Sequence, residues 1–176
     1  ACDTVLLSVG LIPENELSRA LGVELHPKTG GPVVDQYRET SRPGVFAAGN
    51  VVHVHDLVDF VSEEAEIAGK YAALTAQGER RKERRFVRVL PGSGINTCVP
   101  QRLCLIEEEA PMRLLLRTAR PMRQATLTVS GAEGVLFTKR LAVVKPSEMI
   151  AADMNGVRLG DLTEDVTVSI EEGTRG

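Results

Sequence analysis

The chain has 176 residues, of which 43% are hydrophobic and 3% aromatic, with no tryptophan and a formal net charge of −3. This length suffices for one ordinary domain or two small ones with a packed core. The mixed charge and the scarcity of aromatic rings argue against nucleic acid as a partner, because nucleic-acid sites need a basic surface or base-stacking rings.

Two further features narrow the class of protein. No apolar run is long enough to cross a bilayer and the N-terminus lacks the layout of a signal peptide, so we expect a cytoplasmic protein without a membrane partner. The three cysteines, Cys2, Cys98 and Cys104, form no closely spaced pair. We therefore interpret them as small core residues rather than as a disulfide framework or a zinc site.

The first third of the chain predicts α/β structure. Residues 4–9 form a continuous apolar run typical of a strand buried on both faces. Such a strand needs neighbours that this chain does not supply, so we expect the sequence to start within a domain. Residues 13–21 predict a short helix ended by Gly22, and residues 23–35 predict two short strands around a glycine turn. His26 lies in that loop, where we expect an exposed side chain.

The stretch 41–53 carries the clearest functional indication. Residues 45–48 predict a short apolar strand; Gly49 then opens the backbone to close approach, and Asn50 places a side-chain amide at the strand's end. Carboxyl ends of strands in open α/β sheets are where ligands bind. The alternative interpretation is an ordinary turn, because Gly-Asn commonly follows a strand.

His53 and His55 raise the question of a metal site. Imidazoles two residues apart on an extended segment share one face. No third ligand is identifiable in the sequence, so we predict that no metal binds here. Either histidine can instead line a cofactor region or donate a proton near neutral pH.

Residues 56–76 predict one long helix, because apolar residues recur at helical spacing and Gly78 follows as a terminator. Asp59 and Ser62 are candidate N-caps. Glutamates load the first turns, where the helix dipole favours negative charge.

The sequence pattern changes after residue 78. Residues 79–85 are charged and lack apolar periodicity, which predicts a linker. Residues 86–176 hold short alternating segments separated by turn residues, which predicts an immunoglobulin-like or Greek-key β-sandwich. The expected fold is thus an α/β fragment, residues 1–78, followed by an all-β domain, residues 86–176. Extended segments are expected at 86–90, 98–100, 102–106, 112–116, 126–130, 135–138, 141–144 and 166–170.

The order of segments in residues 1–78 resembles the FAD-dependent pyridine nucleotide-disulfide oxidoreductases. In that family a strand ends in a Gly-x-x-Pro-Asn-like turn, as at residues 10–15 here. A Thr-Ser-x-Pro-Gly-Val-Phe-Ala-x-Gly-Asp segment then returns to the flavin domain. Here it reads Thr40-Ser41-Arg42-Pro43-Gly44-Val45-Phe46-Ala47-Ala48-Gly49-Asn50. The family's aspartate is therefore replaced by asparagine.

The resemblance implies that the full-length protein uses FAD and NAD(P) and passes a hydride between nicotinamide and flavin, with a small-molecule or protein electron acceptor. It implies cofactor contacts at Gly49, Asn50 and Val51 on the ribityl and phosphate side. It also implies contacts at Val58 and Asp59, near the helix N-terminus that faces the flavin pyrimidine edge. Asn50 can still accept a hydrogen bond, although the negative charge beside the cofactor is lost. The catalytic residues stay unassigned.

The sequence also departs from that family. It contains no Gly-x-Gly-x-x-Gly phosphate loop and no redox-active cysteine pair. We therefore expect the C-terminal part of such an enzyme, inactive by itself. The all-β region replaces the family's usual dimerisation domain and resembles that of flavin oxidoreductases acting as subunits of larger dehydrogenase complexes.

Two alternatives remain open. The chain can be a non-catalytic interaction module whose β-sandwich mediates subunit assembly. The unpaired strand at residues 4–9 can also join a second copy into a homo-oligomer, because unpaired strand edges recruit strands.

Overall fold

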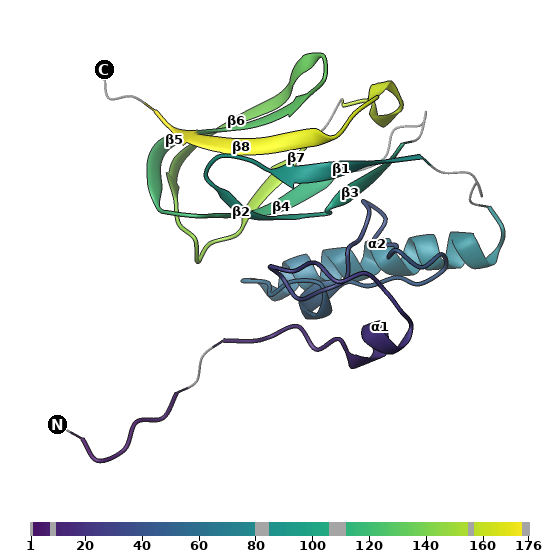
Figure 1. Cartoon of the computed structure of the whole chain (residues 1–176), viewed down its shortest axis with the longest axis horizontal. Helices are drawn as coiled ribbons and strands as arrows, with labels where there is room; N and C mark the ends of the chain where they lie inside the picture. The colour runs from purple at the N-terminus through teal and green to yellow at the C-terminus, as the bar shows by residue number, and fades with distance from the viewer. Residues whose placement is uncertain (1, 8–9, 80–84, 106–111, 155–156, 174–176) are drawn as a thin grey trace.

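The computed structural model describes residues 2–7, 10–79, 85–105, 112–154 and 157–173, and its N-terminal part contains one long helix. That part holds α1 (Glu16–Ala20), the 3-10 turn η1 (Gly49–Val51) and α2 (Val58–Ala76). The C-terminal part is mostly β (Figure 1). Its elements are β1 (Arg85–Pro91), β2 (Ile95–Val99), β3 (Arg102–Leu105), β4 (Arg113–Thr118), β5 (Met122–Gly131), β6 (Gly134–Val144), β7 (Ile150–Asp153), η2 (Leu159–Asp161) and β8 (Val166–Glu172).

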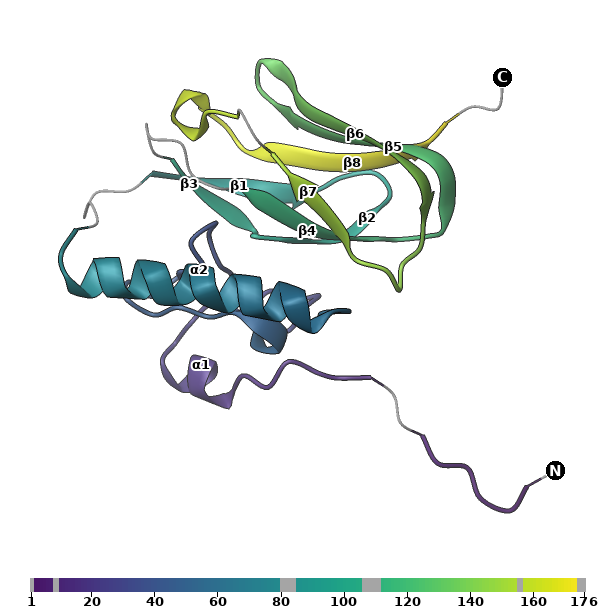
Figure 2. The same cartoon turned by 180° about the vertical axis from the view of Figure 1, so that it is seen from behind.

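The described strands form two sheets around one apolar core. The larger sheet has the order β3-β1-β8-β5-β6 and the smaller has the order β2-β4-β7. Strands β1 and β8 pair in parallel, whereas the other neighbours are antiparallel. Leu114, Leu127 and Val168 are completely buried between the sheets. Figure 2 shows the larger sheet curling over the smaller one. The predicted order of an N-terminal part with one long helix followed by a mostly β part is confirmed.

Most expected strands form, with two corrections. The segments expected at 135–138 and 141–144 are one continuous strand, β6, which pairs with β5 along its length. Strand β7 was not predicted, because Ile150 is the single strand-favouring residue in its Ile-Ala-Ala-Asp sequence. It forms because Ile150 and Ala152 enter the core beside β4. The end of the segment expected at 102–106 and most of the linker expected at 79–85 lie outside the described residues.

The N-terminal part forms fewer strands than expected. Residues 4–7 of the predicted buried strand are in no strand, and Leu6 is 92% exposed; residues 8–9 lie outside the described range. The strands expected around the glycine turn reduce to a bridge between Leu25 and Pro32, and residues 45–48 make one bridge, between Glu39 and Phe46. The cause is the same in each case, because the described residues offer these segments no further strand to pair with.

The helices follow the sequence more closely. Helix α1 is followed by Gly22 at φ +66°, and α2 by Gly78 at φ +77°, as predicted. The expected N-caps of α2 are wrong. Leu57 occupies the cap position, and among the described residues no side chain caps the helix. Ser62 instead donates its hydroxyl to the Val58 carbonyl oxygen at 3.3 Å. No helix in the described ranges is long and apolar enough to span a membrane.

The two parts of the chain pack against each other along β3 and β4. The side chain of Gln36 pairs with the Cys104 backbone as a neighbouring strand would, donating to its carbonyl oxygen at 2.7 Å and accepting from its N–H at 2.8 Å. Arg102 donates to the Thr40 carbonyl oxygen at 2.6 Å. Arg117 on β4 donates to the Val54 carbonyl oxygen at 3.1 Å. These bonds fix the segments around η1 and α2 on the β sheets.

Candidate functional site

The candidate site is the turn η1 and the start of α2, which follow the extended residues 45–48. Gly49 is buried and has φ +72°, a conformation that favours glycine. A Cβ at this position would lie 3.0 Å from Cγ1 of Val61, so the turn packs directly on α2. Asn15 holds the other side of the turn, because its amide donates to the carbonyl oxygens of Gly30 and Val51 at 3.0 and 2.9 Å. The backbone of this turn is therefore fixed from both sides.

One buried carboxylate, Glu64 of α2, joins the turn to the helix. Its Oε2 accepts from the Gly49 backbone N–H at 2.9 Å and lies 3.0 Å from Nε2 of His55. Its Oε1 lies 3.1 Å from Nη2 of Arg38 and 3.3 Å from Nε2 of His53. The side chain of Glu64 is only 3% exposed. We call Arg38, Gly49, His53, His55 and Glu64 the Glu64 cluster.

Electrostatics favour an ionised Glu64 in this cluster. Burial raises the pKa of Glu64, but hydrogen bonds from His53 and His55 and the charge of Arg38 lower it more, so it lies well below its ordinary value. Burial also lowers the pKa of His53, against the raising effect of Glu64. Arg38 keeps its charge as an arginine, although burial lowers its pKa. The cluster is therefore an ion pair between Arg38 and Glu64 to which His53 donates as a neutral ring.

The tautomers of the histidines follow from this charge state. An ionised carboxylate only accepts, so the Nε2 atoms that face Glu64 carry the protons. The rings of His53 and His55 contact each other at a tilt of 56°, with centroids 4.3 Å apart. Nδ1 of His55 is buried and makes no hydrogen bond with the described residues, which is unusual for a polar atom of a side chain that is 1% exposed. Both rings are held in one orientation.

The same residues resemble a metal site in type and spacing. Ligand atoms of His53, His55 and Glu64 lie within 4.8 Å of one another, and two histidines with a carboxylate suit zinc or iron. The sequence-based reasoning that no third ligand exists is therefore wrong. However, Arg38 and the Gly49 N–H already bond to the two carboxylate oxygens of Glu64. A divalent cation bound there would also be repelled by the positive charge of Arg38. The geometry favours the hydrogen-bonded ion pair.

The predicted cofactor residues occupy two places near the cluster, the η1 turn and the first turn of α2. Gly49 is buried, Val51 is half-buried, and Asn50 is exposed with its Oδ1 accepting from the His55 backbone N–H at 3.0 Å. Val58 is 78% exposed and Asp59 is also exposed, both in the uncapped first turn of α2. The contacts between η1 and α2 lie further along the helix, at Val61 and Glu64.

Sequence reasoning missed Arg38 and Glu64. The sequence did contain an indication for Glu64. It lies three residues after Val61 and four after Phe60, which places it on the apolar face of α2. A charged side chain on such a face needs a bonding partner. Arg38 gave no comparable signal, since it lies in an irregular turn and its contact with Glu64 depends on how the chain folds back.

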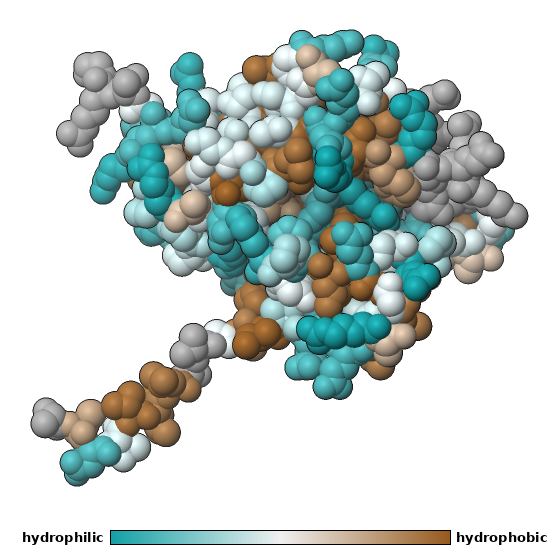
Figure 3. Space-filling view, in the orientation of Figure 1, coloured by the Kyte–Doolittle hydropathy of each residue, from teal (hydrophilic) through white to brown (hydrophobic). Residues whose placement is uncertain are grey.

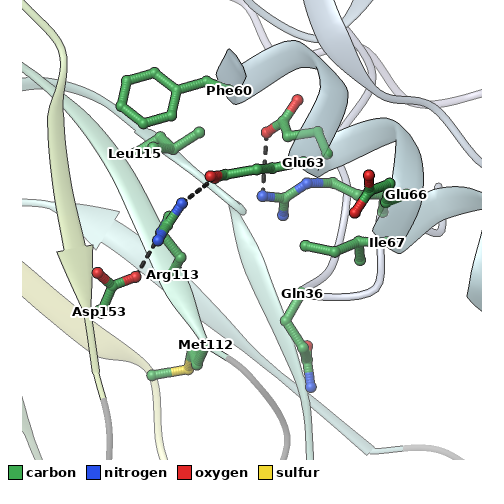
Figure 4. A pocket seen from close by; sticks show the side chains of 11 residues that line it. Gln36, Phe60, Glu63, Glu66, Ile67, Met112, Arg113, Leu115 and Asp153 are labelled. Carbon is green, nitrogen blue, oxygen red and sulfur yellow. Dashed lines mark hydrogen bonds and ion pairs between the residues drawn. The ribbon is translucent and has the colours of Figure 1, made fainter.

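A cavity of about 300 Å³ lies between α2 and strands β4 and β7. Figure 4 shows Arg113 of β4 at its centre, between Glu63 of α2 and Asp153 of β7. Because both carboxylates pair with Arg113, the cavity marks where the β sheets hold α2. Its lining also includes Arg38 and Glu64, so it borders the Glu64 cluster.

Comparison with known proteins gives two similarities. The family model of pyridine nucleotide-disulphide oxidoreductases matches residues 1–78. The chain is also similar to the nitric oxide reductase FlRd-NAD(+) reductase of Enterobacter sp. (strain 638), with 32% identity over 76 residues. That match covers 43% of this chain and 19% of the relative, so the chain corresponds to about a fifth of that protein's length. No solved structure matches the chain.

Proposed function

We infer that residues 1–78 belong to the pyridine nucleotide-disulphide oxidoreductase family, whose members are NAD(P)H-dependent flavin oxidoreductases. We propose that the chain is the C-terminal part of an FAD-dependent, NAD(P)-linked oxidoreductase. In this proposal the complete enzyme includes these residues and an upstream part that carries the phosphate loops. It passes a hydride between nicotinamide and flavin and uses a small-molecule or protein electron acceptor.

The observation that carries this proposal is the exposed, uncapped start of α2 immediately after the Gly49–Val51 turn. The first N–H groups of a helix have no partner within the helix and favour negative charge, so they suit the edge of a flavin, which gains negative charge on reduction. Backbone N–H groups of Val58 and Asp59 supply this contact. Bound FAD supplies the two-electron chemistry, and the protein's part is to bind and orient it.

Asn50 supports the same assignment on the ribityl side. Its side chain is exposed, and one lone pair of Oδ1 is engaged by the His55 N–H. This leaves the second lone pair and the amide nitrogen for a ligand hydroxyl or phosphate oxygen. An aspartate at this position could only accept hydrogen bonds, whereas the asparagine can both accept and donate them. Val51 completes the contact through its backbone, whereas Gly49, whose N–H is bonded to Glu64, holds the turn that presents Asn50.

We further propose that residues 86–176 form an immunoglobulin-like or Greek-key sandwich domain after a linker at 79–85. This domain supports α2 through β4, where Arg113 and Arg117 pair with Glu63 and Asp56. The same domain is the candidate surface for a partner subunit. On one edge of the larger sheet, β6 leaves Val135 64% exposed.

The test is to purify the complete enzyme and the 176-residue chain side by side and to measure flavin absorbance and NAD(P)H oxidation. We expect about one FAD per complete enzyme and no bound flavin in the 176-residue chain, because the phosphate loops are not in this sequence. A complete enzyme that binds no flavin would overturn the proposal, and so would a stoichiometric flavin on the 176-residue chain.

A further inference from the structure

The structure connects the buried Glu64 to the exposed Asn50 amide through His55. The Glu64 carboxylate lies against Nε2 of His55 at 3.0 Å, and the backbone N–H of His55 donates to Oδ1 of Asn50 at 3.0 Å. His55 is the one residue that makes both bonds. Its side chain is 1% exposed, whereas Asn50 is exposed. The connection therefore runs from the protein interior to the surface that holds the cofactor in the proposed function.

Glu64 is suited to fix this geometry because all its acceptor positions are used. A carboxylate offers about four lone-pair directions, and those of Glu64 face Arg38, Gly49, His53 and His55 at 2.9 to 3.3 Å. A buried carboxylate with all its acceptor positions used has few alternative arrangements, although Nε of Arg38 has no hydrogen-bond partner among the described residues. Any rotation of the Glu64 side chain would break several bonds at once. The position of His55 is thus set by a rigid acceptor.

The Gly49 backbone is fixed by the same carboxylate. Its N–H donates to Oε2, the oxygen that also faces His55. Gly49 directly precedes Asn50, and His55, five residues later, bonds to the Asn50 side chain, so one oxygen atom contacts the backbone before the asparagine and the side chain of its hydrogen-bond partner. The free amide nitrogen and the second lone pair of Asn50 can then point in only a narrow range of directions.

We infer that Glu64 and His55 are positioning residues that orient the Asn50 amide for the cofactor; the inference rests on the proposed function. Neither side chain touches the cofactor, since both are buried beneath the turn. Their effect is to preorganise the contact, so that binding does not have to order the turn. A purely structural cluster would stabilise the fold without any specific link to Asn50.

The test measures FAD binding to the complete enzyme by fluorescence titration, with folding checked by circular dichroism. Folded His55→Ala should weaken FAD binding by about tenfold, the loss expected for a displaced hydrogen bond to a cofactor. His55→Gln keeps a donor that reaches Glu64 and should stay within about threefold of the wild type. Glu66→Gln is the control, because Glu66 is an exposed carboxylate on the same helix. Folded His55→Ala with wild-type affinity would overturn the inference.

A double-mutant cycle tests the link to Asn50. If His55 acts through Asn50, His55→Ala should change FAD affinity by less than about twofold in an Asn50→Ala background. Full additivity of the two changes would contradict the inference, because it would mean that His55 acts independently of Asn50.

A measurement without flavin separates this inference from the proposed function. In the 176-residue chain, backbone amide exchange followed by NMR should be slow at Gly49 and His55, because both N–H groups are hydrogen-bonded. Glu64→Gln should accelerate exchange at both positions by about tenfold or more, and Glu66→Gln at neither. If Glu64→Gln does not fold, the pair Arg38→Met with Glu64→Gln removes both charges and serves instead. Unchanged exchange in a folded variant would refute the positioning role whatever the flavin content.

Discussion

The Glu64 cluster makes a strong prediction about stability. Glu64→Gln keeps the shape of the side chain but removes its charge, and it replaces one acceptor oxygen by an NH₂ group that faces donors. The side chains of Glu64 and Arg38 are 3% and 2% exposed, so solvent cannot screen the charge left on Arg38. The variant therefore contains a buried arginine without its partner carboxylate.

The expected loss in the free energy of unfolding follows from the contacts that Glu64→Gln breaks. Removing one partner of a buried ion pair typically costs about 3–5 kcal/mol, because the remaining charge is desolvated and unpaired. Four contacts converge on the Glu64 carboxylate, and the Gln carbonyl oxygen retains some of them, so we expect about 3–4 kcal/mol. Added salt should change the loss little, since the pair is buried.

The assay is urea unfolding of the 176-residue chain followed by circular dichroism, with the free energy of unfolding extrapolated to water. Glu66→Gln is the matched control and should lie within about 0.5 kcal/mol of the wild type, as exposed substitutions do. A Glu64→Gln loss below about 1 kcal/mol would refute the description of Glu64 as a buried, ionised and fully bonded carboxylate.

Three further predictions concern pH, metal and association. Folding lowers the pKa of Glu64 from 4.5 and that of His53 from 6.5, so the unfolded chain binds more protons than the folded one. The stability that each group contributes is therefore present above its unfolded pKa and is lost as the pH falls. Urea midpoints that do not fall between pH 7 and pH 4 would contradict this prediction. Calorimetric titration with Zn²⁺ should show no stoichiometric binding, because Arg38 and Gly49 occupy Glu64; tight binding would establish a metal site instead. The N-terminal residues 2–7 form an exposed apolar arm in which Leu6 is 92% exposed (Figure 3). This arm should make the chain self-associate in light scattering, and Leu6→Asp should reduce the association. A strictly monomeric wild type would contradict this prediction.

Local patterns predicted the elements that depend on nearby residues. The length of α2 and its end at Gly78 follow from helical spacing and a glycine. Most strands of the β part follow from two-residue alternation. Strand β7 escaped prediction because alanines carry no strand preference, and only its contact with β4 places it in a sheet.

The candidate site could be predicted only in part. The Gly49–Asn50 turn could be predicted because a glycine indicates an unusual backbone conformation and an asparagine supplies a hydrogen-bonding side chain. The ion pair between Arg38 and Glu64 joins residues from two separate segments, and no local period encodes it. The strand expected at residues 4–9 shows the reverse case, since its sequence predicts burial and its described part is exposed. An apolar segment needs a partner surface before it becomes a strand.

The central claim is that Asn50 lies at a flavin-contacting turn, and FAD titration of the complete enzyme after removal of its flavin tests it directly. Asn50→Leu removes both the donor and the acceptor of the side chain and should weaken FAD binding by about tenfold or more. Asn50→Asp keeps an acceptor, and its FAD affinity should remain within about threefold of the wild type. Equal FAD affinity for the wild type and a folded Asn50→Leu variant would contradict the account.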